Sequence, residues 1–176
     1  AGGQKKVQKL GDKEPSMRGK NREGSTSDAT ELKQKGHYRT ERLKKWPFKL
    51  TRAQNKVFAE ISGDLAKPHP MQRLLLGDVG SGKTIVAALS MLQVVVSGYQ
   101  AALMAPTELL AEQHLANFKS WMQPLGIEIA FLSSKLTLKT KQETYQAIQS
   151  GKERIIIGTH ALVQESLQFK SLALVI

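Results

Sequence analysis

The stretch Gly77-Asp78-Val79-Gly80-Ser81-Gly82-Lys83-Thr84 decides the fold class of this chain. It fits the pattern G-x-x-x-x-G-K-[ST] of the phosphate-binding loop, or P-loop. The short apolar run 73–76 before it predicts a buried strand, whereas the longer apolar segment 85–92 after it predicts a helix. Because strand, glycine-rich loop and helix are the context that this motif requires, the sequence predicts a nucleotide-binding site.

The residue types of the P-loop explain how it would hold a nucleotide. Its glycines permit the tight turns that bring backbone N–H groups close to phosphate oxygens, and the following helix directs its positive end at the same anion. Lys83 is placed to reach the β- and γ-phosphates, and the Thr84 hydroxyl to be a ligand of Mg²⁺. We therefore expect all eight loop residues to bind ATP with Mg²⁺, and Lys83 and Thr84 to be catalytic. The alternative is a chance glycine-rich turn, and P-loops serve kinases, GTPases and motors alike.

Short apolar strands alternate with helices along the rest of the sequence. Helices are predicted from a Thr51 cap to Leu65 and over 108–121 and 137–150, with a short helix or turn over 161–167. Further strands are predicted over 101–105, 127–132, 154–157 and 172–176. This alternation predicts an α/β fold with a parallel sheet, helices on both faces and a truncation after the fifth strand. Right-handed crossovers would gather the P-loop, 105–107 and 158–160 at one edge of the sheet.

Composition limits the classes of protein to which the chain can belong. With 176 residues, of which 40% are hydrophobic, it corresponds to about one domain with a sizeable core. It has no apolar run of the ~18 residues that a membrane span needs and no recognisable secretory signal. We therefore expect no membrane partner and a cytoplasmic location of the bacterial type, or an organelle if the source is a eukaryote. The lack of cysteine excludes disulfides, thiolate metal sites and cysteine nucleophiles.

The first part of the chain differs from the rest in charge and in apolar content. Residues 1–45 hold 13 lysines and arginines against 6 acidic residues, in a chain whose net charge is +11. Because they contain few large apolar residues, we predict a mostly disordered basic linker or tail, with a short basic helix over 37–46 that ends at Pro47. A solvated tail and a segment attracted to nucleic-acid phosphates explain this charge equally well. The folded domain is predicted over 46–176.

Three further stretches resemble a family of DNA helicases. They are 47–54 (Pro-Phe-Lys-Leu-Thr-Arg-Ala-Gln), 104–114 (Met-Ala-Pro-Thr-Glu-Leu-Leu-Ala-Glu-Gln-His) and 158–162 (Gly-Thr-His-Ala-Leu). Together with the P-loop they resemble the first motor domain of a superfamily 2 helicase, and within it the RecG family, over about residues 46–176. The resemblance implies a RecA-like P-loop NTPase domain. Transcription-repair coupling translocases are similar around the P-loop but usually depart from the last two stretches.

The resemblance assigns three residues before the P-loop to the surroundings of a bound adenine. By position, Gln54 resembles a glutamine that recognises adenine through its amide, which offers both a donor and an acceptor to the edge of a base. Phe48 and Leu50 would lie near the base. The plain alternative is that Gln54 is a glutamine on a helix surface.

The resemblance also assigns DNA-binding roles to two later stretches. Pro106, Thr107 and Glu108 resemble motif Ia, and Thr159 and His160 resemble a later DNA-contacting motif. In the family, hydroxyls and N–H groups at helix starts hold backbone phosphates of one strand. The alternative is that Thr107 only caps its helix and that His160 only packs; capping and DNA contact are compatible for Thr107.

The resemblance implies an activity for the parent enzyme. We expect it to couple ATP hydrolysis to movement on branched double-stranded DNA, such as forks and Holliday junctions, in repair and recombination, and to be a monomer. In the family the fifth strand leads into Asp-Glu-x-His, and the sequence here stops at Ile176, so we expect binding without efficient turnover. A P-loop nucleotide kinase is an alternative, although 107–176 contain only one arginine, Arg154. A non-catalytic nucleic-acid-binding module is another, although the P-loop is intact.

Overall fold

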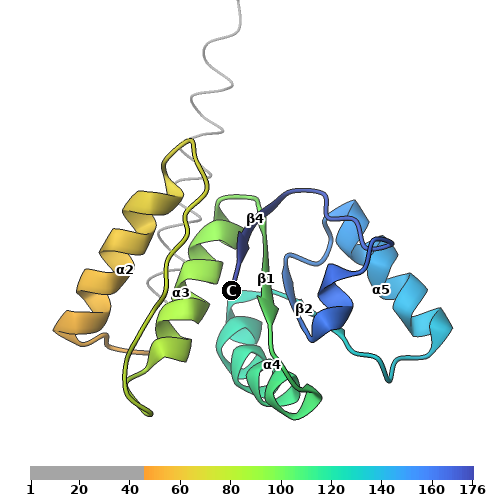
Figure 1. Cartoon of the computed structure of the whole chain (residues 1–176), viewed down its shortest axis with the longest axis horizontal. Helices are drawn as coiled ribbons and strands as arrows, with labels where there is room; N and C mark the ends of the chain where they lie inside the picture. Colours follow the sequence, from red (N-terminus) through yellow and green to blue (C-terminus); the bar gives the residue numbers. More distant parts are fainter. Residues whose placement is uncertain (1–45) are drawn as a thin grey trace, which may run out of the picture.

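The structure is a computed structural model that describes residues 46–176, so the predicted tail over 1–45 and all but the last residue of the helix predicted over 37–46 lie outside the described residues. The α-helices are α2 (Arg52–Leu65), α3 (Lys83–Val96), α4 (Glu108–Met122) and α5 (Leu138–Ser150). The strands are β1 (Gln100–Met104), β2 (Ile129–Leu132), β3 (Ile155–Gly158) and β4 (Leu172–Val175). Two short 3₁₀ helices, η1 (Gln123–Leu125) and η2 (His160–Val163), complete the fold (Figure 1).

The four strands form one parallel sheet in the order β2-β3-β1-β4. Met104 of β1 and Leu132 of β2 both lie opposite Gly158 of β3, so these three strands end level with one another. The loops that follow them therefore leave from the same edge of the sheet. The predicted α/β fold with a parallel sheet is confirmed.

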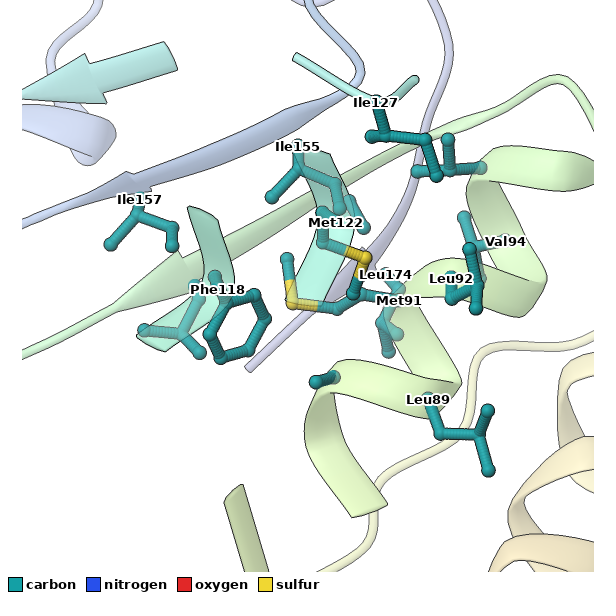
Figure 2. Close-up of a cluster of buried hydrophobic side chains, with 14 of the residues drawn as sticks. Leu89, Met91, Leu92, Val94, Phe118, Met122, Ile127, Ile155, Ile157 and Leu174 are labelled. Carbon is teal, nitrogen blue, oxygen red and sulfur yellow. The ribbon is translucent and has the colours of Figure 1, made fainter. Parts of the chain in front are cut away.

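Helices cover both faces of the sheet. One face packs against α3 and α4 in a cluster that includes Met91 and Phe118, which are completely buried, together with Ile155 and Ile157 of β3 (Figure 2). Ile156, between them on the strand, belongs instead to the second cluster with Ile148 of α5. This alternation along β3 is what a strand buried on both sides requires, because successive side chains point to opposite faces.

Three threonines fix where helices begin. Thr51, Thr107 and Thr137 precede α2, α4 and α5, and each hydroxyl accepts a hydrogen bond from the backbone N–H three residues further on. Such N-caps satisfy N–H groups that have no partner within the helix.

Among residues 46–176, no helix is both long enough and apolar enough to cross a bilayer.

The predicted strand over 73–76 is wrong. These residues form no strand, and the side chains of Leu74 and Leu76 are each 80% exposed. The apolar run satisfies the local pattern of a buried strand, but a strand also needs a neighbour to complete its hydrogen-bonded ladder. Here β4 is the edge of the sheet, and a groove of about 120 Å³ separates its Leu174 from Leu75. The sheet of the described residues therefore has four strands instead of the predicted five.

Candidate nucleotide site and nucleic-acid edge

The P-loop connects an extended segment to the first turn of α3. Gly80 and Gly82 have φ angles of 81° and 83°, in the left-handed region that favours glycine. A Cβ atom at Gly82 would lie 2.3 Å from Nε2 of Gln54, and one at Gly77 would lie 2.8 Å from Oγ of Ser81. The left-handed backbone favours glycine at Gly80 and Gly82, and at Gly82 a Cβ atom would also force the Gln54 amide to move.

Lys83 turns its ammonium group back into the loop. Its Nζ donates hydrogen bonds to the carbonyl oxygens of Gly77, at 2.5 Å, and Asp78, at 2.8 Å. Thr84 follows in the first turn of α3, whose N-terminal N–H groups face the same loop. A cation held inside a glycine-rich turn at a helix N-terminus is an arrangement suited to a phosphate group.

Gln54 joins α2 to the P-loop. Its Oε1 accepts a hydrogen bond from the N–H of Thr51, and its Nε2 donates one to the carbonyl oxygen of Ser81, both at 2.9 Å. A pocket of about 250 Å³ lies between α2 and the P-loop, lined by Ala53, Gln54, Val57, Leu75, Leu76, Gly77, Asp78, Ser81, Lys83 and Val86. The structure thus brings the predicted adenine-binding glutamine to the predicted phosphate-binding loop.

Phe48 packs among aromatic residues. Its ring centroid lies 5.2 Å from that of Trp121 and 5.6 Å from that of Trp46, with edge-to-face geometry in both pairs. Such pairs stabilise a packed cluster. Phe48 does not line the pocket beside the P-loop, whereas Gln54 does.

The nucleic-acid residues predicted from the sequence lie after the strands β1 and β3. Pro106 and Thr107 follow β1, and the Thr107 hydroxyl accepts a hydrogen bond from the N–H of Leu110 at 3.3 Å. Thr159 follows β3 and is only 2% exposed, and its hydroxyl oxygen has no hydrogen-bond partner within residues 46–176. His160 is exposed at the start of η2. These residues share one edge of the sheet because β1 and β3 end level with one another.

Glu108 binds the loop between β2 and α5. Its Oε1 accepts hydrogen bonds from the hydroxyls of Ser133 and Ser134, both at 2.8 Å, and its Oε2 pairs with Nζ of Lys135 at 2.5 Å. Lys135, with the two serine hydroxyls, lowers the pKa of Glu108 to about 2. No sequence motif marks this serine–lysine loop; the available signal was that it follows a strand, β2, as the other predicted segments do.

Comparison with known proteins identifies the family. A sequence model described as DEAD/DEAH box helicase matches residues 51–176. The chain belongs to the DEAD/DEAH box helicase family. Among its relatives is the ATP-dependent DNA helicase RecG of Escherichia coli K12, which is 56% identical over 130 residues, covering 74% of this chain and 19% of the relative. RecG of Aquifex aeolicus is 49% identical over 134 residues, covering 76% of this chain and 17% of the relative.

A solved structure supports the same assignment at the level of the fold. The structure of RecG bound to a three-way DNA junction superimposes with a TM-score of 0.73 at 38% sequence identity, over 85% of this chain and 22% of that one. The resemblance to RecG helicases inferred from the sequence is confirmed. This DEAD/DEAH box helicase chain spans about a fifth of the length of the RecG relatives that it matches.

Proposed function

We propose that this chain is the nucleotide-binding part of an ATP-dependent DNA helicase of the RecG type. The observation that carries the proposal is the P-loop that places Lys83 inside a glycine turn at the N-terminus of α3. The family uses nucleotides, and the relatives named above are ATP-dependent DNA helicases. A cytoplasmic location, as for the bacterial relatives, and a monomeric state are part of the same proposal.

The nucleotide would bind with its phosphates in the P-loop and its base towards α2. The backbone N–H groups of 77–84 and the Lys83 ammonium would hold the β- and γ-phosphates. To reach them, Lys83 exchanges its two carbonyl acceptors for phosphate oxygens. Gln54 would contact adenine, which requires its amide to release Ser81 or Thr51.

The site has the residue that a nucleotide-bound Mg²⁺ needs from this loop. The Thr84 hydroxyl, in the first turn of α3, would be the protein ligand of Mg²⁺. The ion, when bound, neutralises charge that develops between the β- and γ-phosphates. Lys83 contributes positive charge to the same phosphates.

The partner proposed for the carboxyl edge of the sheet is branched double-stranded DNA. The relative whose structure matches was solved bound to a three-way DNA junction. Thr107 and the exposed His160 would contact backbone phosphates of one strand, with Pro106 and Glu108 around them, and the buried Thr159 would hold the segment that presents His160. Phosphate contacts carry the affinity and release counterions, so binding should weaken steeply as salt is added.

Two titrations test this function. The chain should bind Mg-ATP, and it should bind a three-way junction with an affinity that falls steeply between about 50 and 200 mM salt. Variants Thr107→Ala and His160→Ala should weaken junction binding and leave nucleotide binding unchanged. Junction binding that does not respond to salt, or that is absent at low salt, would remove the DNA-binding part of the proposal.

A further inference from the structure

The segment that leads into the P-loop has no place in the sheet. We name residues 70–76 the P-loop arm; it runs as an extended trace beside α2 and α3 (Figure 1). Leu74 and Leu76 face outwards, each 80% exposed, whereas Met71 and Leu75 line the groove beside β4. Within the described residues, therefore, no ladder of backbone hydrogen bonds fixes the arm.

Arg73 anchors this arm to α2. Its guanidinium donates to Oδ2 of Asp64 through Nη2, at 2.5 Å, and through Nε, at 3.2 Å, and to Oε2 of Glu60 through Nη1, at 2.8 Å. Glu60 and Asp64 are four residues apart and so lie on the same face of the helix. The planar guanidinium therefore meets both carboxylates at once, which fixes the direction of the Arg73 side chain as well as its position.

α2 contacts the nucleotide-binding segment at two separate points. At the N-terminal end of the helix, Gln54 donates to the carbonyl oxygen of Ser81 in the P-loop; at its C-terminal end, Asp64 holds Arg73. These two positions are about 15 Å apart along the helix axis. The helix is itself fixed on α3 by buried Ile61 and by a hydrogen bond from Gln93 to Ser62, at 2.7 Å.

We propose that Arg73, clamped by Glu60 and Asp64, is a positioning residue for the nucleotide site. It does not line the pocket between α2 and the P-loop, so it acts through the arm and not through the ligand. The clamp fixes the start of the arm while Gln54 fixes the P-loop, so the loop is held in the geometry that receives phosphate. This inference rests on the proposed nucleotide binding and adds the residues that pre-organise it.

Removing an ordinary surface ion pair would have a different effect from removing this clamp. Exposed pairs add little to global stability, and the side chain of Arg73 is 32% exposed. Loss of a clamp that positions the loop must instead lower the local order of the arm and weaken nucleotide binding. Those two quantities, and not the melting temperature, separate the two roles.

Lys67 offers a matched control for Arg73. Its Nζ pairs with the other oxygen of Asp64, Oδ1, at 2.7 Å, but Lys67 lies just beyond the C-cap of α2, Ala66, and does not belong to the arm. Arg73→Met and Lys67→Met each remove one cation from the same carboxylate, and only the first releases the arm. Arg73→Lys keeps the charge and part of the contact, and should restore part of the effect.

The first measurement is hydrogen exchange of residues 70–82 in the chain without nucleotide. Exchange should be faster in Arg73→Met than in the unmodified chain, and unchanged in Lys67→Met. Equal exchange in both variants would overturn the clamp. This readout requires no ligand, so it stands even if the unmodified chain fails to bind Mg-ATP, a result that would contradict the proposed function.

The second measurement is Mg-ATP affinity by calorimetry. Arg73→Met should weaken binding about tenfold, Lys67→Met by less than about twofold, and Arg73→Lys by an intermediate factor. Equal affinities of Arg73→Met and Lys67→Met, with the unmodified chain binding normally, would overturn the positioning role while leaving the proposed function intact.

Discussion

The side-chain Nε2 of Gln54 donates a hydrogen bond to the carbonyl oxygen of Ser81, at 2.9 Å, and so joins α2 directly to the P-loop. The other end of the same amide accepts from the N–H of Thr51 and completes the N-terminal cap of the helix. One side chain therefore serves the stability of α2 and the position of the loop, and substitutions can separate these two roles.

Replacing Gln54 by glutamate should weaken nucleotide binding without destabilising the chain. A glutamate keeps an oxygen that accepts from Thr51 but loses the N–H group that reaches Ser81 and would contact adenine. We expect Gln54→Glu to bind Mg-ATP about tenfold more weakly with little change in melting temperature. Gln54→Ala should lose affinity and also melt at a lower temperature, because it removes the capping interaction. Equal melting temperatures for the two variants would argue against the dual role.

Glu108 should make the stability of the chain depend on pH in the acid range. Its pKa is lowered from 4.5 to about 2 in the folded protein, chiefly by Lys135 and then by Ser133 and Ser134. A carboxyl whose pKa is depressed on folding contributes stability above its unfolded pKa and loses it as the pH falls through the folded value. The contribution should therefore be complete above about pH 5 and decline towards pH 2.

Chemical denaturation between about pH 2 and pH 6 measures this contribution of Glu108 to stability. Glu108→Gln cannot ionise, so it should be less stable than the unmodified chain at pH 6, and the difference should shrink as the pH approaches 2. Glu112→Gln is the matched control, because Glu112 lies on the same helix and the contacts with Ser133, Ser134 and Lys135 belong to Glu108. A stability difference between Glu108→Gln and the unmodified chain that stays constant with pH would contradict the assigned role.

Phe118 should be among the most costly core residues to truncate. Its side chain is completely buried between α4 and the sheet (Figure 2), whereas Leu109 on the same helix is 76% exposed. Phe118→Ala should lower the free energy of unfolding by about 3 to 5 kcal/mol, because it removes buried apolar surface and leaves a cavity. Leu109→Ala should change it by less than about 0.5 kcal/mol. Urea denaturation of both variants measures the difference.

Thr107 should contribute to helix stability and to DNA binding through the same hydroxyl. Thr107→Ala removes the N-cap of α4 and should cost about 1 kcal/mol of stability, together with junction affinity. Thr107→Ser retains a hydroxyl and should behave like the unmodified chain in both measurements. The comparison, made by denaturation and by junction titration, isolates the hydroxyl from the rest of the side chain.

Local sequence patterns predicted the elements that depend on local physics. The boundaries of α4 and α5 match closely, because the threonine caps of both helices and Gly151 at the end of α5 act within a few residues. The prediction of a strand over 73–76 was wrong because the sequence of a strand does not show which neighbouring strand would complete its ladder. An apolar run indicates that burial is favourable, and the partner decides whether a strand forms.

The same distinction holds for the candidate site. The P-loop was predicted because its chemistry lies in eight consecutive residues. The Glu108–Lys135 pair joins residues 27 positions apart, and the Arg73–Asp64 pair joins an arm to a helix across a turn. No spacing rule links such residues, so only the folded arrangement reveals them.

The central claim is that 77–84 binds the phosphates of a nucleotide through Lys83, and calorimetry with Mg-ATP tests it most directly. Lys152 lies just before β3, away from the P-loop pocket, and supplies a matched removal of one positive charge. We expect the unmodified chain and Lys152→Ala to bind Mg-ATP with similar affinity and Lys83→Ala to lose measurable binding. Equal binding of Mg-ATP by Lys83→Ala and the unmodified chain would contradict it.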